Sequence, residues 1–285
     1  MFAIERQQQI LEKLRDEGAV FVSKLSVEFG VAEETIRRDL EKLEKQEKLL
    51  RTHGGAVPID DNKHEPSLEK RRKINVEGKE KVAAIAADLV SPGDTIFLDA
   101  STTTYYIARE LKKMKNITVV TNSLDSIREL SQNPDIKVIG TGGMVGENAS
   151  FVGSIAEDSV REKYVADKIF FSSRGVTSEL GVLDSNEQEC AMKKCMMASS
   201  CKKIYVCEKT KIGRIGFAKL ASFEDLDFFV TESMPEEEMK RKLEEANVEL
   251  LTSEDKNKAP GISREHFIFI KPCSIDNNNA MEGTL

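Results

Sequence analysis

Apolar residues near the start of the chain recur at the spacing of amphipathic helices. Ile36, Leu40 and Leu43 are separated by four and three positions, so they fall on one stripe of a helix. Shorter apolar patterns over residues 10–14 and 25–29 predict two further helices upstream. A helix that packs through such a stripe against its own domain presents its opposite, charged side to solvent.

After the third helix the pattern becomes that of short strands. Residues 49–51 and the Gly54-Gly55 pair predict a strand, a turn and a second strand. Three helices followed by a two-stranded wing are typical of a winged helix-turn-helix domain. We therefore predict such a domain over residues 1–57.

The charged side of the third helix suits contact with a DNA duplex. Thr35, Arg37 and Arg38 face outward near its start, where a recognition helix reads base edges. Arginine binds either guanine or phosphate, and the alternative interpretation is a charged face that contacts only solvent. The expected DNA-binding residues of the helix and the wing are Thr35, Arg37, Arg38, Lys42, Arg51, His53 and Gly54.

The charge balance limits how the chain can bind nucleic acid. Its net charge is −7, and residues 1–57 carry ten Lys and Arg against eleven Asp and Glu. Non-specific affinity grows with the number of neutralised phosphates, so it is expected to be weak. Specific binding to double-stranded operator DNA then favours a duplicated contact surface, as in a homodimer or homotetramer on repeated half-sites.

Beyond the first domain, a polar linker leads into alternating strands and helices. Residues 58–75 are rich in charge and contain Pro58 and Pro66. Apolar runs that predict buried strands then alternate with helical patterns, which indicates a doubly wound, mainly parallel α/β sheet over residues 76–252. The runs lie at residues 95–98, 117–121, 137–140, 168–171, 203–207 and 228–231. Residues 253–285 are expected to form an extension, with an edge strand near 263–272 and a disordered tail.

Polar residues follow several of the predicted strands at the point where each strand ends. In parallel sheets, ligands bind beyond these carboxyl ends. Hydroxyl side chains at a helix start, together with Arg and Lys, suit a phosphorylated ligand, although Ser and Thr also simply cap helices. The expected ligand-binding residues are Asp99, Ser101, Thr102, Thr103, Thr104, Asn122, Gly142, Gly143, Ser172, Arg174 and Lys211.

Several segments resemble the DeoR family of bacterial transcriptional regulators. TIRRDL (35–40) and RTHGGA (51–56) match the signature of its DNA-binding domain, and ERQQQILEKL (5–14) is similar to its first helix. One departure is Ala32, where the family usually has serine. This resemblance implies that the chain regulates transcription, most often as a repressor of sugar catabolism.

The second half, from Arg71 to Val248, also resembles the family's sensor domain. That domain is related in fold to ribose-5-phosphate isomerase and to the CoA-transferase-like group. The resemblance implies a phosphorylated sugar or polyol whose phosphate lies near residues 101–104 and Lys211. Ser101 stands where the family usually has glycine, and Glu208 where it usually has aspartate.

Other classes of function are disfavoured by what the chain lacks. Its His and Cys residues have no metal-ligand spacing, so we expect neither a metal nor a cofactor. No apolar run approaches the roughly 20 residues of a membrane helix, so we expect a cytoplasmic protein without membrane contact. Ser172-Ser173-Arg174 stands where the isomerase relatives carry catalytic carboxylates, so we expect no enzyme. Two alternatives stay open: an isomerase-like enzyme with an accessory DNA-binding unit, and a protein–protein adaptor.

Overall fold

The computed structural model describes residues 2–17, 19–57 and 66–254. The chain divides into two compact units, residues 1–66 and 67–285, which are described separately. Residues 68–73, which we expected within the linker, form helix α4 (Leu68–Lys73) of the second unit. The edge strand and the tail expected after residue 254 lie outside the described residues. Within the described ranges, every helix is too short or too polar to span a membrane.

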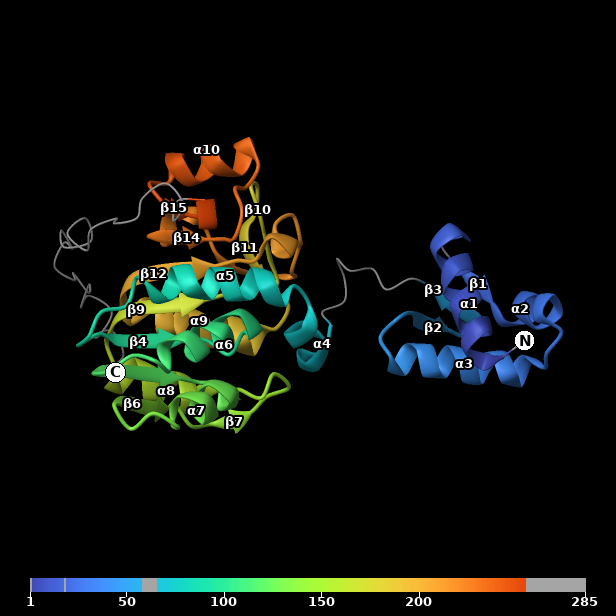
Figure 1. Cartoon of the computed structure of the whole chain (residues 1–285), viewed down its shortest axis with the longest axis horizontal. Coiled ribbons are helices and arrows are strands. Elements are labelled where there is room, and N and C mark those ends of the chain that lie inside the picture. The colour runs from blue at the N-terminus through green and yellow to red at the C-terminus, as the bar shows by residue number, and fades with distance from the viewer. Residues whose placement is uncertain (1, 18, 58–65, 255–285) are drawn as a thin grey trace, which may run out of the picture. The chain divides into compact units, whose positions relative to one another are not determined.

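The first unit is a three-helix domain with a small antiparallel sheet (Figure 1). Ile36, Leu40 and Leu43 are buried in its core together with Ile10 and Leu25, so the predicted helical stripe faces inward. The three strands are ordered β1-β3-β2, and the last two form the wing. This arrangement confirms the predicted winged helix-turn-helix. Its elements are α1 (Ala3–Glu17), β1 (Val20–Phe21), α2 (Val22–Phe29), α3 (Glu33–Lys45), β2 (Leu50–Thr52) and β3 (Gly55–Val57).

Two glycines fix the path of the chain around α3. Gly30 ends α2 with φ 63°, a left-handed conformation that glycine adopts without steric cost. Gly55 pairs with Phe21 so closely that an added Cβ would lie 1.8 Å from the carbonyl oxygen of Val20. The turn before the recognition helix and the attachment of the wing therefore both require glycine.

The second unit is built on a seven-stranded sheet in which all neighbouring strands are parallel. Its strand order is β15-β14-β12-β9-β4-β5-β6. The strands are β4 (Thr95–Leu98), β5 (Ile117–Thr121), β6 (Ile136–Gly140), β9 (Ala166–Phe171), β12 (Ser200–Val206), β14 (Phe228–Val230) and β15 (Glu249–Leu251). Six of them were predicted, and β15 was not.

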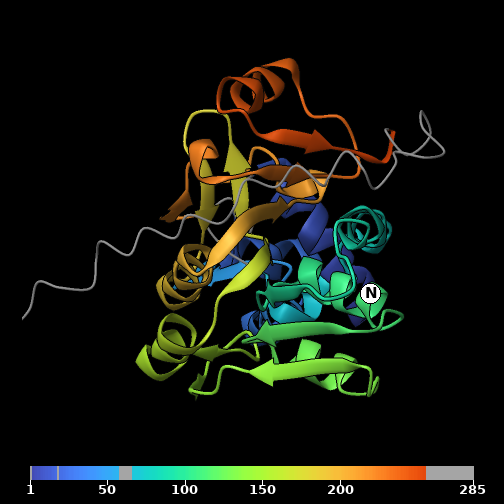
Figure 2. The same cartoon turned by 90° about the vertical axis from the view of Figure 1, so that its left-hand side faces the viewer.

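Helices cover both faces of this sheet (Figure 2). Successive strand residues point to opposite faces, so Ile96 and Leu98 lie in one core cluster and Phe97 in the other. The first cluster packs against α5 (Val76–Ala87), α6 (Thr102–Leu111) and α7 (Leu124–Leu130). The second packs against α8 (Ser154–Lys163), α9 (Glu187–Ala198) and α10 (Glu237–Glu245). The expected doubly wound α/β fold is confirmed.

Shorter elements that the sequence did not predict follow several of the strands. After β6 comes a hairpin of β7 (Met144–Val145) and β8 (Phe151–Val152). A separate antiparallel sheet contains β10 (Gly175–Thr177), β11 (Gly181–Asp184) and β13 (Ala218–Ala221). Two 3-10 turns, at Lys209–Lys211 and Phe223–Asp225, follow β12 and β13.

The order of the strands marks where a ligand site is expected. From β4 the chain moves outward through β5 and β6, then returns to β9 on the other side of β4. Such a switch point between neighbouring parallel strands opens a crevice at their carboxyl ends. Asp99 directly follows β4, and Ser172 directly follows β9.

Candidate nucleic-acid interface and ligand site

The two arginines near the start of α3 are exposed and each is paired within its own helix. An Arg37 guanidinium nitrogen lies 3.0 Å from a Glu33 carboxylate oxygen, and the Nε of Arg38 lies 3.3 Å from Oε1 of Glu34. Exposed pairs of this kind contribute at most about 1 kcal/mol. Both guanidinium groups can therefore exchange a glutamate for phosphate or guanine at little cost.

The other predicted DNA-binding residues lie on the same helix and on the wing. Lys42, Arg51, His53 and Gly54 are exposed, and Thr35 is half-buried. Glu44 orients the start of the wing, because its carboxylate accepts from the backbone N–H of Arg51 at 3.0 Å. His53 and Gly54 form the turn between β2 and β3.

A buried ion pair that the sequence analysis missed holds the recognition helix in place. Asp39 is buried on α3, where its carboxylate accepts from Arg6 at 2.6 Å and from Gln7 at 2.8 Å. Both donors come from α1, so the pair fixes α3 against α1. The available signal was that Arg6 and Asp39 lie in the two helical segments that carry the family resemblance.

The start of α3 offers a test of the departure at position 32. Ala32 occupies the N-cap in an extended conformation, and its methyl group provides no hydrogen-bond acceptor. We expect Ala32→Ser to stabilise the first unit by about 0.5–2 kcal/mol, because serine accepts from a first-turn N–H. Urea unfolding followed by circular dichroism measures the change. Ala32→Val serves as the control, and an equal stability of the serine and valine variants would contradict the expected cap.

In the second unit, Asp99 ties together the elements at the switch point. Its Oδ1 accepts from the backbone N–H of Ser101 at 3.1 Å and from the Thr104 hydroxyl at 2.6 Å. Its Oδ2 accepts from the backbone N–H of Ser172 at 3.0 Å. The carboxylate thus joins the end of β4, the start of α6 and the end of β9. Asp99 therefore organises the site, and its predicted contact with a ligand stays a prediction.

The start of α6 and the turn after β12 bring several hydrogen-bond donors together. Ser101 caps α6 by accepting from the Thr104 N–H at 3.2 Å, so the capping alternative holds for its side chain. Thr102 and Thr103 follow in the first turn, whose N–H groups lack partners within the helix and favour anions. The buried Lys211 ammonium lies 2.9 Å from the Ser172 hydroxyl and 3.5 Å from the Thr103 hydroxyl. We call this group, Thr102, Thr103, Ser172 and Lys211, the cradle.

The remaining predicted ligand residues shape the neighbouring segments. Asn122 is buried, donates to the Phe151 carbonyl at 3.1 Å, and its Oδ1 lacks a hydrogen-bond partner among the described residues. Gly142 and Gly143 have φ values of 71° and 114°, a region that favours glycine. The turn that leads to β7 therefore accounts for both glycines. Arg174 is buried between β9 and β10.

A buried charged cluster next to the cradle was not predicted. Lys193 on α9 lies 2.6 Å from Oδ2 of Asp184 and 3.5 Å from Oδ2 of Asp99. Burial alone would lower the pKa of Lys193, but the surrounding carboxylates raise it above its ordinary value. Glu189, one turn earlier, is also buried, and burial raises the pKa of its carboxyl group despite the nearby Lys193. The sequence signal was the segment 181–189 with Lys193, which resembles the family's sensor domain.

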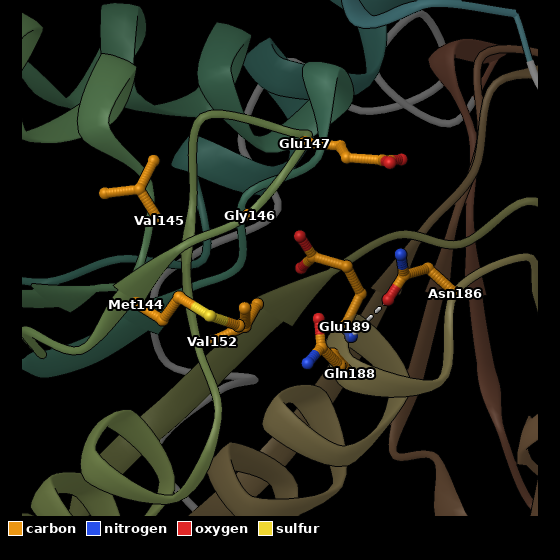
Figure 3. A pocket seen from close by; sticks show the side chains of 8 residues that line it. All are labelled: Met144, Val145, Gly146, Glu147, Val152, Asn186, Gln188 and Glu189. Carbon is orange, nitrogen blue, oxygen red and sulfur yellow. Dashed lines mark hydrogen bonds between the residues drawn. The ribbon is translucent and has the colours of Figure 1, made fainter.

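A cavity of about 280 Å³ opens beside Glu189 (Figure 3). Figure 3 shows the Glu189 side chain reaching toward the loop at Gly146, with Asn186 on its other side. The cavity lies between the β7–β8 hairpin and the start of α9. It is lined by Met144, Val145, Gly146, Glu147, Val152, Asn186, Gln188 and Glu189. Within the described ranges, His, Cys, Asp and Glu side chains form no group of three suited to a metal ion.

Comparisons with known proteins match both units to the same family. The model of the DeoR-like helix-turn-helix domain matches residues 6–62, and that of the DeoR C terminal sensor domain matches residues 74–233. The chain is 43% identical over 234 residues, 82% of its length and 90% of the relative's, to the uncharacterized HTH-type transcriptional regulator YulB of Bacillus subtilis. It is 33% identical to a putative aga operon transcriptional repressor of Escherichia coli O157:H7, over 87% of this chain and 93% of that protein.

Among solved structures, ribose 5-phosphate isomerase A from Neisseria gonorrhoeae overlaps 48% of this chain and 53% of its own, with a TM-score of 0.37 and 17% identity. The sequence relatives that match most of the chain are named as regulators of transcription, and the first unit matches the DeoR-like helix-turn-helix model. The isomerase-like alternative, an enzyme with an accessory DNA-binding unit, is therefore set aside.

Proposed function

Since the chain belongs to the DeoR family of transcriptional regulators, we propose that it represses a sugar-catabolic operon and leaves its operator when a phosphorylated sugar binds the sensor unit. The observation that carries the proposal is the Lys211 ammonium beside Thr103 and Ser172 at the start of α6. A buried cation next to the N–H groups of a helix's first turn matches the charge and the acceptor oxygens of a phosphate group.

The DNA-binding unit supports the other half of the proposal. Two copies of the winged helix, in a homodimer or homotetramer, place Thr35, Arg37 and Arg38 in successive major grooves. His53 and Gly54 then lie near the adjacent backbone or minor groove. A sugar phosphate that weakens operator binding a hundredfold needs only about 2.7 kcal/mol of coupling between the two sites.

The phosphate cradle is tested by removing its ammonium. We expect some members of a panel of pentose, hexose and polyol phosphates to raise the melting temperature of the wild type, because a ligand that binds only the folded state stabilises it. Lys211→Met should lose this response, and inorganic phosphate should bind it at least about tenfold more weakly, since a hydrogen bond to a charged group contributes about 1.5–3 kcal/mol.

Lys209 gives the matched control, because it is an exposed lysine on the same 3-10 turn. Lys209→Met should respond to the panel as the wild type does. Equal responses of wild type and Lys211→Met to every sugar phosphate would contradict the cradle and, with it, the proposed effector class.

A further inference from the structure

The cavity beside Glu189 has a chemical character opposite to that of the cradle. Each residue that the structure describes in its lining is apolar, an amide or glycine, or acidic. Met144, Val145 and Val152 supply an apolar wall, while Asn186 and Glu189 supply polar groups. A phosphate would be repelled by the carboxylates here, so the cavity suits an uncharged ligand group that donates hydrogen bonds.

Of the two carboxylates in this lining, Glu147 is exposed and Glu189 is buried. The Oε1 of Glu189 accepts from the Ser150 hydroxyl and, at 3.4 Å, from the Asn148 amide. A carboxylate has about four acceptor positions, so these two donors leave capacity for others. Burial raises the pKa of the Glu189 carboxyl group, because water solvates its charged form poorly there. Hydrogen-bond donors of a ligand inside the cavity would stabilise that charge.

Helix α9 and Asp99 connect the lining of the cavity with the cradle. Lys193 lies one helical turn from Glu189 and 3.5 Å from Asp99, whose carboxylate accepts from the Ser172 N–H at 3.0 Å. The hydroxyl of Ser172 in turn accepts from Lys211 at 2.9 Å. A small molecule with a phosphate at one end and hydroxyl groups at the other has the chemistry that both sites favour.

We propose that the cavity binds the hydroxyl-bearing end of the phosphorylated ligand, and that Glu189 accepts hydrogen bonds from its hydroxyl groups. The inference rests on the proposed function, because it assumes a phosphate in the cradle. It adds the residue that distinguishes a sugar or polyol phosphate from inorganic phosphate. The apolar wall of Met144, Val145 and Val152 then faces the carbon atoms of the same ligand.

The same carboxylate connects the cavity to the first helix of the second unit. Asn148 donates to Glu189, and its own Oδ1 accepts from Arg71 of α4. Helix α4 begins at Leu68, shortly after the segment that joins the two units. A ligand hydroxyl that competes for Oε1 of Glu189 weakens its hydrogen bond with Asn148, and with it the hydrogen bond between Asn148 and Arg71. Occupation of the cavity is thereby transmitted to the segment that carries the DNA-binding unit.

The test compares Glu189→Gln with Glu187→Gln in the full chain. Glu187 is exposed in the same helical turn and does not line the cavity, so it is a matched control. Calorimetry is run with inorganic phosphate and with the sugar phosphates that stabilise the wild type. We expect both variants to bind inorganic phosphate normally. Glu189→Gln should bind the sugar phosphates about tenfold or more weakly, since bonds to a charged acceptor are the strong ones.

The outcomes separate this inference from the proposed function. Wild-type sugar-phosphate affinity in Glu189→Gln would overturn the inference, while the Lys211→Met result would still decide the cradle. Loss of inorganic phosphate binding in Glu189→Gln would also overturn it, because Glu189 would then only support the fold. For the transmission, Asn148→Ala lacks the contact with Arg71 from the start. It should bind the sugar phosphate but bind operator DNA more weakly than the wild type even without ligand, and wild-type DNA affinity without ligand would overturn that part.

Discussion

Alanine at position 38 is expected to abolish sequence-specific DNA binding while leaving the protein folded. The Arg38 side chain is 73% exposed, and its ion pair with Glu34 contributes at most about 1 kcal/mol. A bidentate contact between arginine and guanine contributes about 1–3 kcal/mol of discrimination. A dimer loses two such contacts, so operator affinity should fall at least about thirtyfold.

The measurement uses DNA selected from a random-sequence library by the wild-type protein. Gel-shift titrations on the selected fragment compare wild type, Arg38→Ala and Lys45→Ala. Lys45 is exposed at the other end of α3 and pairs with Glu41, so its loss should weaken binding evenly across sequences and reduce the salt slope by about one unit. Equal affinity of Arg38→Ala and wild type for the selected fragment would refute the recognition-helix assignment.

The strands of the large sheet were predictable because both of their faces are buried. The predicted strands at residues 95–98 and 117–121 match β4 and β5 residue for residue, since their apolar runs are bounded by polar turns. The short strands β10 and β11 have three and four residues in a glycine-containing segment, too few for any periodicity to show. Helix α4 has no buried residue, so no apolar stripe marked it within the polar linker.

The sequence predicted where the candidate site lies better than it predicted what each of its residues does. Topology places the ends of β4 and β9 side by side, and the polar residues after both strands do meet there. Which side chain serves the fold and which faces a ligand depends on hydrogen bonds that spacing does not encode. Spacing did not predict that the Asp99 carboxylate accepts from Ser101, Thr104 and Ser172, and its expected contact with a ligand stays a prediction.

Lys193 shows most clearly what sequence alone could not reveal. Lys193 and Lys194 are identical neighbours in a helix, yet the first is buried and the second exposed. Lys193 holds Asp184 and Asp99, so its removal leaves two buried carboxylates without their shared cation. Breaking a buried ion pair in this way typically costs about 3–5 kcal/mol. The raised pKa of Lys193 keeps its ammonium charged at neutral pH, so the full effect is present there.

We therefore expect Lys193→Met to destabilise the sensor unit by about 3–5 kcal/mol and to abolish sugar-phosphate binding, because Asp99 then no longer holds the cradle in place. Lys194→Met, the matched control, should change stability by less than about 0.5 kcal/mol, as surface substitutions do. Urea unfolding followed by circular dichroism gives both values. Equal unfolding curves for the two variants at neutral pH would show that the cluster neither stabilises the unit nor organises its ligand site.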